Sequence, residues 1–127
     1  MSRAHYLPIN QFTLLDHACM AVMAAFDHPP YHVGSSTQRP DWRDVDVRLM
    51  LPDEEYDALF AEKLPEFWSL ICLAITEYLS RVSGLPVDFQ IQRMTDANRE
   101  YRGHFRNPLG LTPPRLYAGG PAEETQR

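Results

Sequence analysis

Two aspartates, Asp44 and Asp46, stand two residues apart in the run Asp44-Val45-Asp46-Val47, where polar and apolar residues alternate. Strand side chains repeat their direction every second residue, so the alternation predicts a strand with both carboxylates on one face. Asp88 lies in a second alternating run, Val87 to Arg93, and would join the pair if the two strands are neighbours. Three carboxylates held together repel one another unless a cation lies among them. Because Mg²⁺ and Mn²⁺ prefer oxygen ligands, the acids predict a site for one of these metals.

A polar turn precedes the first two acids. Gly34, Ser35 and Ser36 follow a short predicted strand at residues 31–33. Glycine lets the backbone approach a ligand closely, and the amide and hydroxyl groups of the two serines are suited to donate hydrogen bonds to phosphate oxygens. Arg48 shares the face of Asp46 and would either hold a phosphate or neutralise the carboxylates. The sequence leaves both roles open.

The run Val33-Gly34-Ser35, followed by a loop and then Asp44-Val45-Asp46-Val47, resembles the signature of nucleotidyltransferases of the DNA polymerase β type. A third carboxylate on a later strand completes the site in that family, and Asp88 stands at the matching position. The resemblance extends over residues 10–93. In size, the chain is similar to the minimal nucleotidyltransferase modules of bacteria and their phages.

The resemblance implies transfer of a nucleoside monophosphate, most simply AMP from ATP, to an acceptor hydroxyl with release of pyrophosphate. It also implies that Asp44 and Asp46 hold two Mg²⁺ or Mn²⁺ ions, and that Asp88 completes the site of the second ion. The implied nucleotide contacts are Gly34, Ser35, Ser36 and Arg48. Another nucleoside triphosphate would fit as well as ATP. The acceptor, whether a protein, an RNA end or a small molecule, is not identified by the sequence.

The elements that position these residues follow from apolar periodicity and from prolines and glycines. Helices are predicted over residues 10–26, 53–63, 65–83 and 96–101, and strands over 31–33, 44–51 and 87–93. Asp53 would cap the second helix with its side chain. Each strand offers one apolar face, so the predicted fold class is α/β (α+β), in a nucleotidyltransferase-like arrangement. Its small mixed sheet would have helices packed on one face and an open polar face.

Length and charge limit the other possibilities. At 127 residues the chain suits one domain, predicted over residues 1–118, followed by a mobile tail over 119–127. A net charge of −5 argues against a general nucleic-acid binder, since there is no basic excess to neutralise phosphates. The first residues do not form a secretion signal and no apolar run is long enough to span a membrane, so a cytoplasmic location is expected. The sequence does not indicate an oligomeric state.

Several features have less specific interpretations. A non-catalytic nucleotide-binding or antitoxin-like module with the same fold is the alternative function; a small metal-dependent nuclease would share the acids but would not explain Gly34-Ser35. The other polar and thiol groups have structural interpretations. Two histidines, His28 and His32, are too few for a zinc site, and Cys19 and Cys72 are predicted to be buried thiols. Arg39 and Arg43 are predicted to be exposed loop arginines, with contact to a triphosphate as the alternative, and Trp42 is predicted to pack at an edge, with stacking on a base as the alternative. Residues 106–110, RNPLG, are predicted to form a turn.

Overall fold

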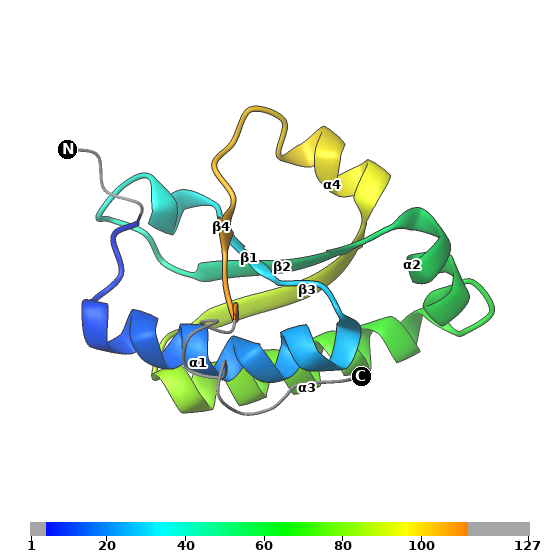
Figure 1. The fold of residues 1–127 in the computed structure, drawn as a ribbon, viewed down its shortest axis with the longest axis horizontal. Helices are drawn as coiled ribbons and strands as arrows, with labels where there is room; N and C mark the ends of the chain where they lie inside the picture. The colour runs from blue at the N-terminus through cyan, green and yellow to red at the C-terminus, as the bar shows by residue number, and fades with distance from the viewer. Residues whose placement is uncertain (1–4, 112–127) are drawn as a thin grey trace, which may run out of the picture.

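The computed structural model describes residues 5–111, so the predicted tail at 119–127 lies outside the described residues. In chain order the elements are α1 (Ile9–Phe26), β1 (Tyr31–Val33), the 3₁₀ turn η1 (Ser35–Thr37), β2 (Val45–Leu51), α2 (Asp53–Phe60), α3 (Pro65–Ser83), β3 (Val87–Arg93), α4 (Met94–Glu100) and β4 (Asn107–Pro108). The strands form one sheet in the order β3-β2-β1-β4 (Figure 1). β2 and β3 are parallel, and the other pairs are antiparallel. The predicted α/β class with a small mixed sheet is therefore confirmed.

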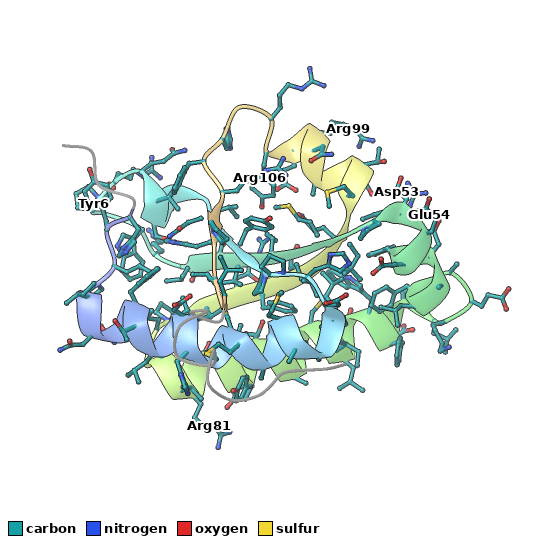
Figure 2. The ribbon with its side chains drawn as sticks, viewed as in Figure 1. Tyr6, Asp53, Glu54, Arg81, Arg99 and Arg106 are labelled. Atoms are coloured by element: carbon teal, nitrogen blue, oxygen red, sulfur yellow. The ribbon has the colours of Figure 1, made fainter. Side chains whose placement is uncertain are left out.

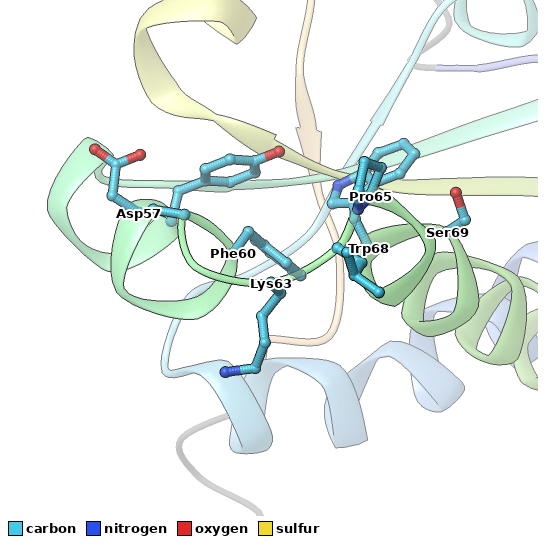
Figure 3. Close-up of a pocket in the computed structure, with 9 residues that line it drawn as sticks. Asp57, Phe60, Lys63, Pro65, Trp68 and Ser69 are labelled. Atoms are coloured by element: carbon cyan, nitrogen blue, oxygen red, sulfur yellow. The ribbon is translucent and has the colours of Figure 1, made fainter.

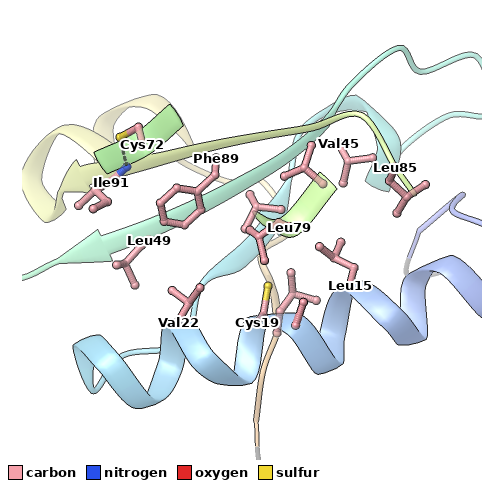
Figure 4. Packing of buried hydrophobic residues seen from close by; sticks show 14 of the residues in the cluster. Leu15, Cys19, Val22, Val45, Leu49, Cys72, Leu79, Leu85, Phe89 and Ile91 are labelled. Carbon is pink, nitrogen blue, oxygen red and sulfur yellow. Dashed lines mark hydrogen bonds between the residues drawn. The ribbon is translucent and has the colours of Figure 1, made fainter. Parts of the chain in front are cut away.

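The core lies between the sheet and the two long helices, α1 and α3, which run side by side beneath it (Figures 1 and 4). Both alternating runs turn their apolar residues into this core: Val45, Val47, Leu49 and Leu51 from β2, and Val87, Phe89 and Ile91 from β3. Cys19 and Cys72 are free and buried in it, as predicted. Burial, with the nearby Asp16 carboxylate, raises the pKa of Cys19 to about 12. No helix within residues 5–111 is long and apolar enough to cross a membrane.

Prolines and glycines set the helix ends largely as predicted. Pro65 occupies the first turn of α3, and Gly84 ends that helix with φ of 73°. The prediction that Asp53 caps α2 is wrong, because α2 has no side-chain cap. The Asp53 carboxylate instead accepts hydrogen bonds from the Thr95 amide at 3.0 Å and the Thr95 hydroxyl at 2.5 Å. Asp53 thus ties the start of α2 to the start of α4, which lie near each other in Figure 2.

The second face of the sheet is not open along its whole length, contrary to the prediction. α4 begins directly after β3 and folds back over this face. Val33 and Met50 from the strands pack there with Ala97 and Tyr101, and Tyr31 and Met94 lie against them. Arg48, predicted on the open polar face with Asp46, is only 6% exposed, and Met50, two residues further along the strand, is 2% exposed. On β2, the polar part of this face is therefore limited to Asp46 and the residue before the strand, Asp44.

The RNPLG segment forms the edge strand β4 instead of the predicted turn. It pairs with β1, and the Leu109 amide continues the contact by donating to the Pro30 carbonyl at 2.8 Å. Leu109 is fully buried. Just beyond it, the Gly110 amide donates to Asp16 Oδ1 at 2.8 Å, which fixes the chain against α1.

One stripe of side chains on α3 lies along the outer edge of β3 and forms hydrogen bonds with the backbone of this strand. Trp68, Cys72, Thr76 and Ser80 recur every fourth residue and so lie on one face of the helix. Trp68 Nε1 donates to the Ile91 carbonyl at 2.8 Å. The Ile91 amide donates to Cys72 Sγ at 3.5 Å (dashed in Figure 4).

The other two residues of the stripe bond both backbone groups of the strand residue that each faces. Thr76 Oγ1 accepts from the Phe89 amide at 2.9 Å and donates to its carbonyl at 3.3 Å. Ser80 Oγ accepts from the Val87 amide at 3.1 Å and donates to its carbonyl at 3.5 Å. Side chains of α3 thus replace the hydrogen bonds that a neighbouring strand would make.

Thr76→Val tests this contact. Valine keeps the shape of threonine but leaves the Phe89 amide without its partner, so we expect the free energy of unfolding to fall by about 1–3 kcal/mol in urea denaturation. Thr13→Val is the matched control, because the exposed Thr13 hydroxyl bonds only the Ile9 carbonyl of its own helix. Equal stability losses in the two variants would contradict the role given to Thr76.

Candidate functional site

The turn after β1 brings its backbone directly against one of the predicted site acids. Gly34 has φ of 84° and ψ of −165°, a region that essentially only glycine occupies. β1 pairs with β2 so that Val33 faces Asp46, which places the next residue, Gly34, at the Asp46 side chain. A Cβ added to Gly34 would lie 2.2 Å from Asp46 Oδ2. The absence of a side chain at Gly34 is therefore what makes room for this carboxylate.

A cavity of about 320 Å³ opens beside this contact. Three of the predicted site residues line it: Ser35, Asp44 and Asp46. Asp44 precedes the first residue of β2 and is exposed, whereas Asp46 lies within the strand and its side chain is 27% exposed. The structure thus brings together the serine of the turn and the first two acids at the solvated end of the sheet.

The loop between the turn and β2 supplies the rest of the cavity wall. Arg39, Asp41, Trp42 and Arg43 line the cavity with the residues above. Arg39 Nε lies 3.3 Å from Asp41 Oδ1 in an exposed pair. Trp42 is half-buried and donates from Nε1 to the Tyr6 carbonyl at 3.2 Å, so it packs at an edge as predicted while also facing the cavity. The residue types of this loop do not by themselves indicate a role in the site, although a short loop between two site segments must lie beside it.

Asp46 is the electrostatically unfavourable member of the set. Burial raises the pKa of its carboxyl group, and the negative charges of Asp88, Asp44 and Glu100 raise it further, while Arg48 lowers it. The net shift of the Asp46 pKa is upward, so the attraction of Arg48 does not offset the combined effects of burial and of the neighbouring carboxylates. A further cation in the cavity would stabilise the ionised carboxylate.

Asp88 faces Asp46 across the parallel pair β2–β3 but is not part of the same cavity. The two residues are in register. Arg48 stands between them, with Nη2 3.3 Å from Asp88 Oδ2 and 3.7 Å from Asp46 Oδ1. The Asp88 side chain, 46% exposed, instead lines a separate cavity of about 270 Å³ with Trp68 and Leu73.

The three acids are therefore not gathered around one point as predicted, because the guanidinium occupies the space between two of them. Among residues 5–111, no group of three or more histidine, cysteine, aspartate or glutamate side chains is placed to hold a metal ion. What the geometry offers to a cation is the pair on the cavity wall, Asp44 and Asp46.

Ser36 was predicted to contact the nucleotide, but its side chain points into the protein. It is fully buried, and Ser36 Oγ lies 2.6 Å from His32 Nε2. The 3₁₀ turn causes this, since it directs Ser35 to the cavity and turns the next residue inward. Burial, with His5 nearby, lowers the pKa of His32 to about 4, so the ring is neutral at physiological pH. His28 pairs with Glu55 at 2.9 Å, apart from His32.

A larger cavity, of about 500 Å³, lies where α2 meets α3 (Figure 3). Its wall is mainly apolar and includes Phe60, Leu64 and Trp68. Its one acid, Asp57, is paired with Arg93 at 3.1 Å. This cavity carries no arrangement of paired acids and donors comparable to that beside Gly34.

Comparisons with models of protein families, with curated proteins and with solved structures gave no match for this chain. Assignment of the site therefore depends on its own residues and their geometry.

The upward shift of the Asp46 pKa predicts a pH dependence. The folded state holds the Asp46 proton more tightly than the unfolded state, so this residue lowers stability progressively as pH rises above its ordinary value of 3.8. In metal-free buffer, Asp46→Asn should therefore be more stable than wild type at pH 7, with the difference shrinking toward pH 3. Urea denaturation across this range measures it.

Asp41→Asn is the control for this measurement, because it removes one exposed negative charge from the same cavity. An equal gain of stability in both variants would show that the cavity charge as a whole, and not the buried position of Asp46, is responsible.

Proposed function

We propose that this protein is a metal-dependent nucleotidyltransferase that moves a nucleoside monophosphate, most simply AMP from ATP, to an acceptor hydroxyl. One observation carries the proposal: the glycine-only backbone of Gly34 lies against the Asp46 carboxylate at a cavity that Ser35 and Asp44 also line. The resemblance in sequence had paired these same residues. A metal-dependent nuclease would need the acids but not the close approach of the turn.

The residues on the cavity wall fit a divalent cation such as Mg²⁺ or Mn²⁺. Asp44 and Asp46 offer only oxygen ligands, and Asp46 has a charge that its surroundings do not compensate. A bound Mg²⁺ would neutralise triphosphate oxygens and make the α-phosphorus more electrophilic. Asp44 and Asp46 would hold it.

The chain's other residues would position the nucleotide. Ser35 lines the cavity, where its hydroxyl would donate to a phosphate oxygen, and Arg39 and Arg43 add positive charge to the lining of the same cavity. With the phosphates held there, catalysis would come chiefly from positioning and charge neutralisation.

Asp88 would act on the acceptor. Its carboxylate is half-exposed and faces the neighbouring cavity, from which a hydroxyl group would approach. In the transfer, the acceptor oxygen bonds to the α-phosphorus, the bond from that phosphorus to the pyrophosphate oxygen breaks, and pyrophosphate leaves. The hydroxyl proton passes to Asp88 and then to solvent.

A second candidate is a module that binds a nucleotide without transferring it. The observation in its favour is the pairing of Asp88 with Arg48, which engages the acid that catalysis would use. The two candidates share the nucleotide site and differ only in whether pyrophosphate is released.

Gly34→Ala tests the nucleotide site. The new methyl group would displace the Asp46 carboxylate, so we expect affinity for ATP with Mg²⁺ to fall at least about tenfold, equivalent to roughly 1.4 kcal/mol, in calorimetry. Gly103→Ala is the matched control: Gly103 also has positive φ, 74°, but its Cβ would meet nothing within 4 Å. Unchanged affinity in Gly34→Ala would contradict the proposed site.

Pyrophosphate release by the wild-type protein then separates the two candidates. It should be assayed with protein, RNA and small-molecule acceptors in turn. Release with any of them identifies the transferase and its acceptor class, whereas tight ATP binding with no release in all three identifies the module.

A further inference from the structure

Arg48 is a buried cation whose three guanidinium nitrogens all donate hydrogen bonds to protein oxygens. Its side chain is 7% exposed. Nε donates to Tyr101 Oη at 3.2 Å, and Nη1 donates to the carbonyl oxygens of Val47 at 3.2 Å and Asp88 at 2.6 Å. Nη2 donates to Asp88 Oδ2 at 3.3 Å and lies 3.7 Å from Asp46 Oδ1. A guanidinium has five N–H donors; the hydrogen bonds to Tyr101, Val47 and Asp88 involve all three of its nitrogens, and Nη2 is also within ion-pair distance of Asp46.

This set of contacts decides between the two roles left open for Arg48. A residue that binds phosphate needs a donor directed to the ligand, but each guanidinium nitrogen of Arg48 already donates to one of the protein's own oxygens. Arg48 is also absent from the wall of the cavity that Ser35 and Asp44 line. Its position between two carboxylates on adjacent strands is that of a neutralising charge.

Arg48 also limits how many metal ions the site accepts. A second ion held by Asp46 and Asp88 would have to lie between these two residues, where the guanidinium already is. Arginine does not lose its proton in a protein, so it cannot make room by becoming neutral. A divalent ion there would be repelled at short range by a fixed positive charge.

We infer that Arg48 is a built-in cation in the place of a second metal ion, so that the nucleotide-loaded site binds one divalent ion, on Asp44 and Asp46. The inference rests on the proposed function, since it concerns the ion that accompanies the nucleotide. It gives Asp88 a second task beside that of accepting the proton of the acceptor hydroxyl: Asp88 holds Arg48 in position and does not ligate metal. Arg48 is then a positioning residue whose charge substitutes for that of an ion.

The test counts ions. The wild-type protein is dialysed to equilibrium against Mn²⁺ and α,β-methylene-ATP, an analogue that cannot release pyrophosphate, and the excess of each on the protein side is measured. We expect one Mn²⁺ per bound analogue. Two Mn²⁺ per analogue would overturn the inference while leaving nucleotide binding intact. No excess of either would overturn both this inference and the proposed function.

Variants test the number of bound Mn²⁺ ions further, and none of these measurements requires catalytic activity. Asp88→Asn should still bind one Mn²⁺ per analogue with its affinity for Mn²⁺ changed less than threefold, whereas Asp46→Asn should lose Mn²⁺. Arg48→Met removes the fixed cation and should raise the count to two. Loss of Mn²⁺ in Asp88→Asn to the same extent as in Asp46→Asn would show that Asp88 is a ligand and would overturn the inference. If Arg48→Met does not fold, the wild-type and Asp88→Asn counts still decide.

Discussion

The buried positive charge of Arg48 is the constraint on which the rest of the structure depends. A charge taken out of water is tolerated only when it is paired and hydrogen-bonded. Here the partners come from β2, β3 and the residue that ends α4, so the same contacts that satisfy Arg48 join three elements. They also explain why α4 lies over the sheet: Tyr101 must come close enough to accept the Nε–H.

This arrangement explains how two aspartates are accommodated on adjacent strands in register. Asp46 and Asp88 would repel each other if they faced only one another. With the guanidinium between them the pair is tolerated without a ligand, although the pKa of Asp46 remains raised because it is also buried. The protein therefore keeps one carboxylate whose charge is incompletely compensated, at the wall of the cavity that Ser35 and Asp44 also line.

Elements defined by local pattern were predictable from the sequence, and those that depend on distant partners were not. β2 and β3 followed from alternation, and both ends of α3 from Pro65 and Gly84. β4 has two residues and is a strand only because β1 lies beside it, so no periodicity marks it. From its position, Asp53 was predicted to cap the start of α2, but its side chain is hydrogen-bonded by Thr95, which is 42 positions away.

The same distinction holds within the candidate site. Gly34 and Asp46 were recognisable because both belong to the sequence signature that the chain resembles, and the structure places them in contact. The inward direction of Ser36 follows from the 3₁₀ turn, and the side chain is then held by its hydrogen bond with the buried ring of His32. The role of Arg48 could be assigned only from the structure, because nothing in the sequence shows that the Tyr101 hydroxyl accepts a hydrogen bond from it.

The stripe of α3 along β3 has a consequence for how this protein meets other chains. An edge strand with free amides and carbonyls is a template on which a foreign strand can add, and this is a common route to aggregation. On β3 the outward groups of Val87, Phe89 and Ile91 are taken by helix side chains. At the opposite edge, β4 is two residues long and one of them is Pro108, which has no amide proton to offer. The described sheet therefore cannot readily be lengthened by another strand, and a partner would have to recognise side chains instead of backbone.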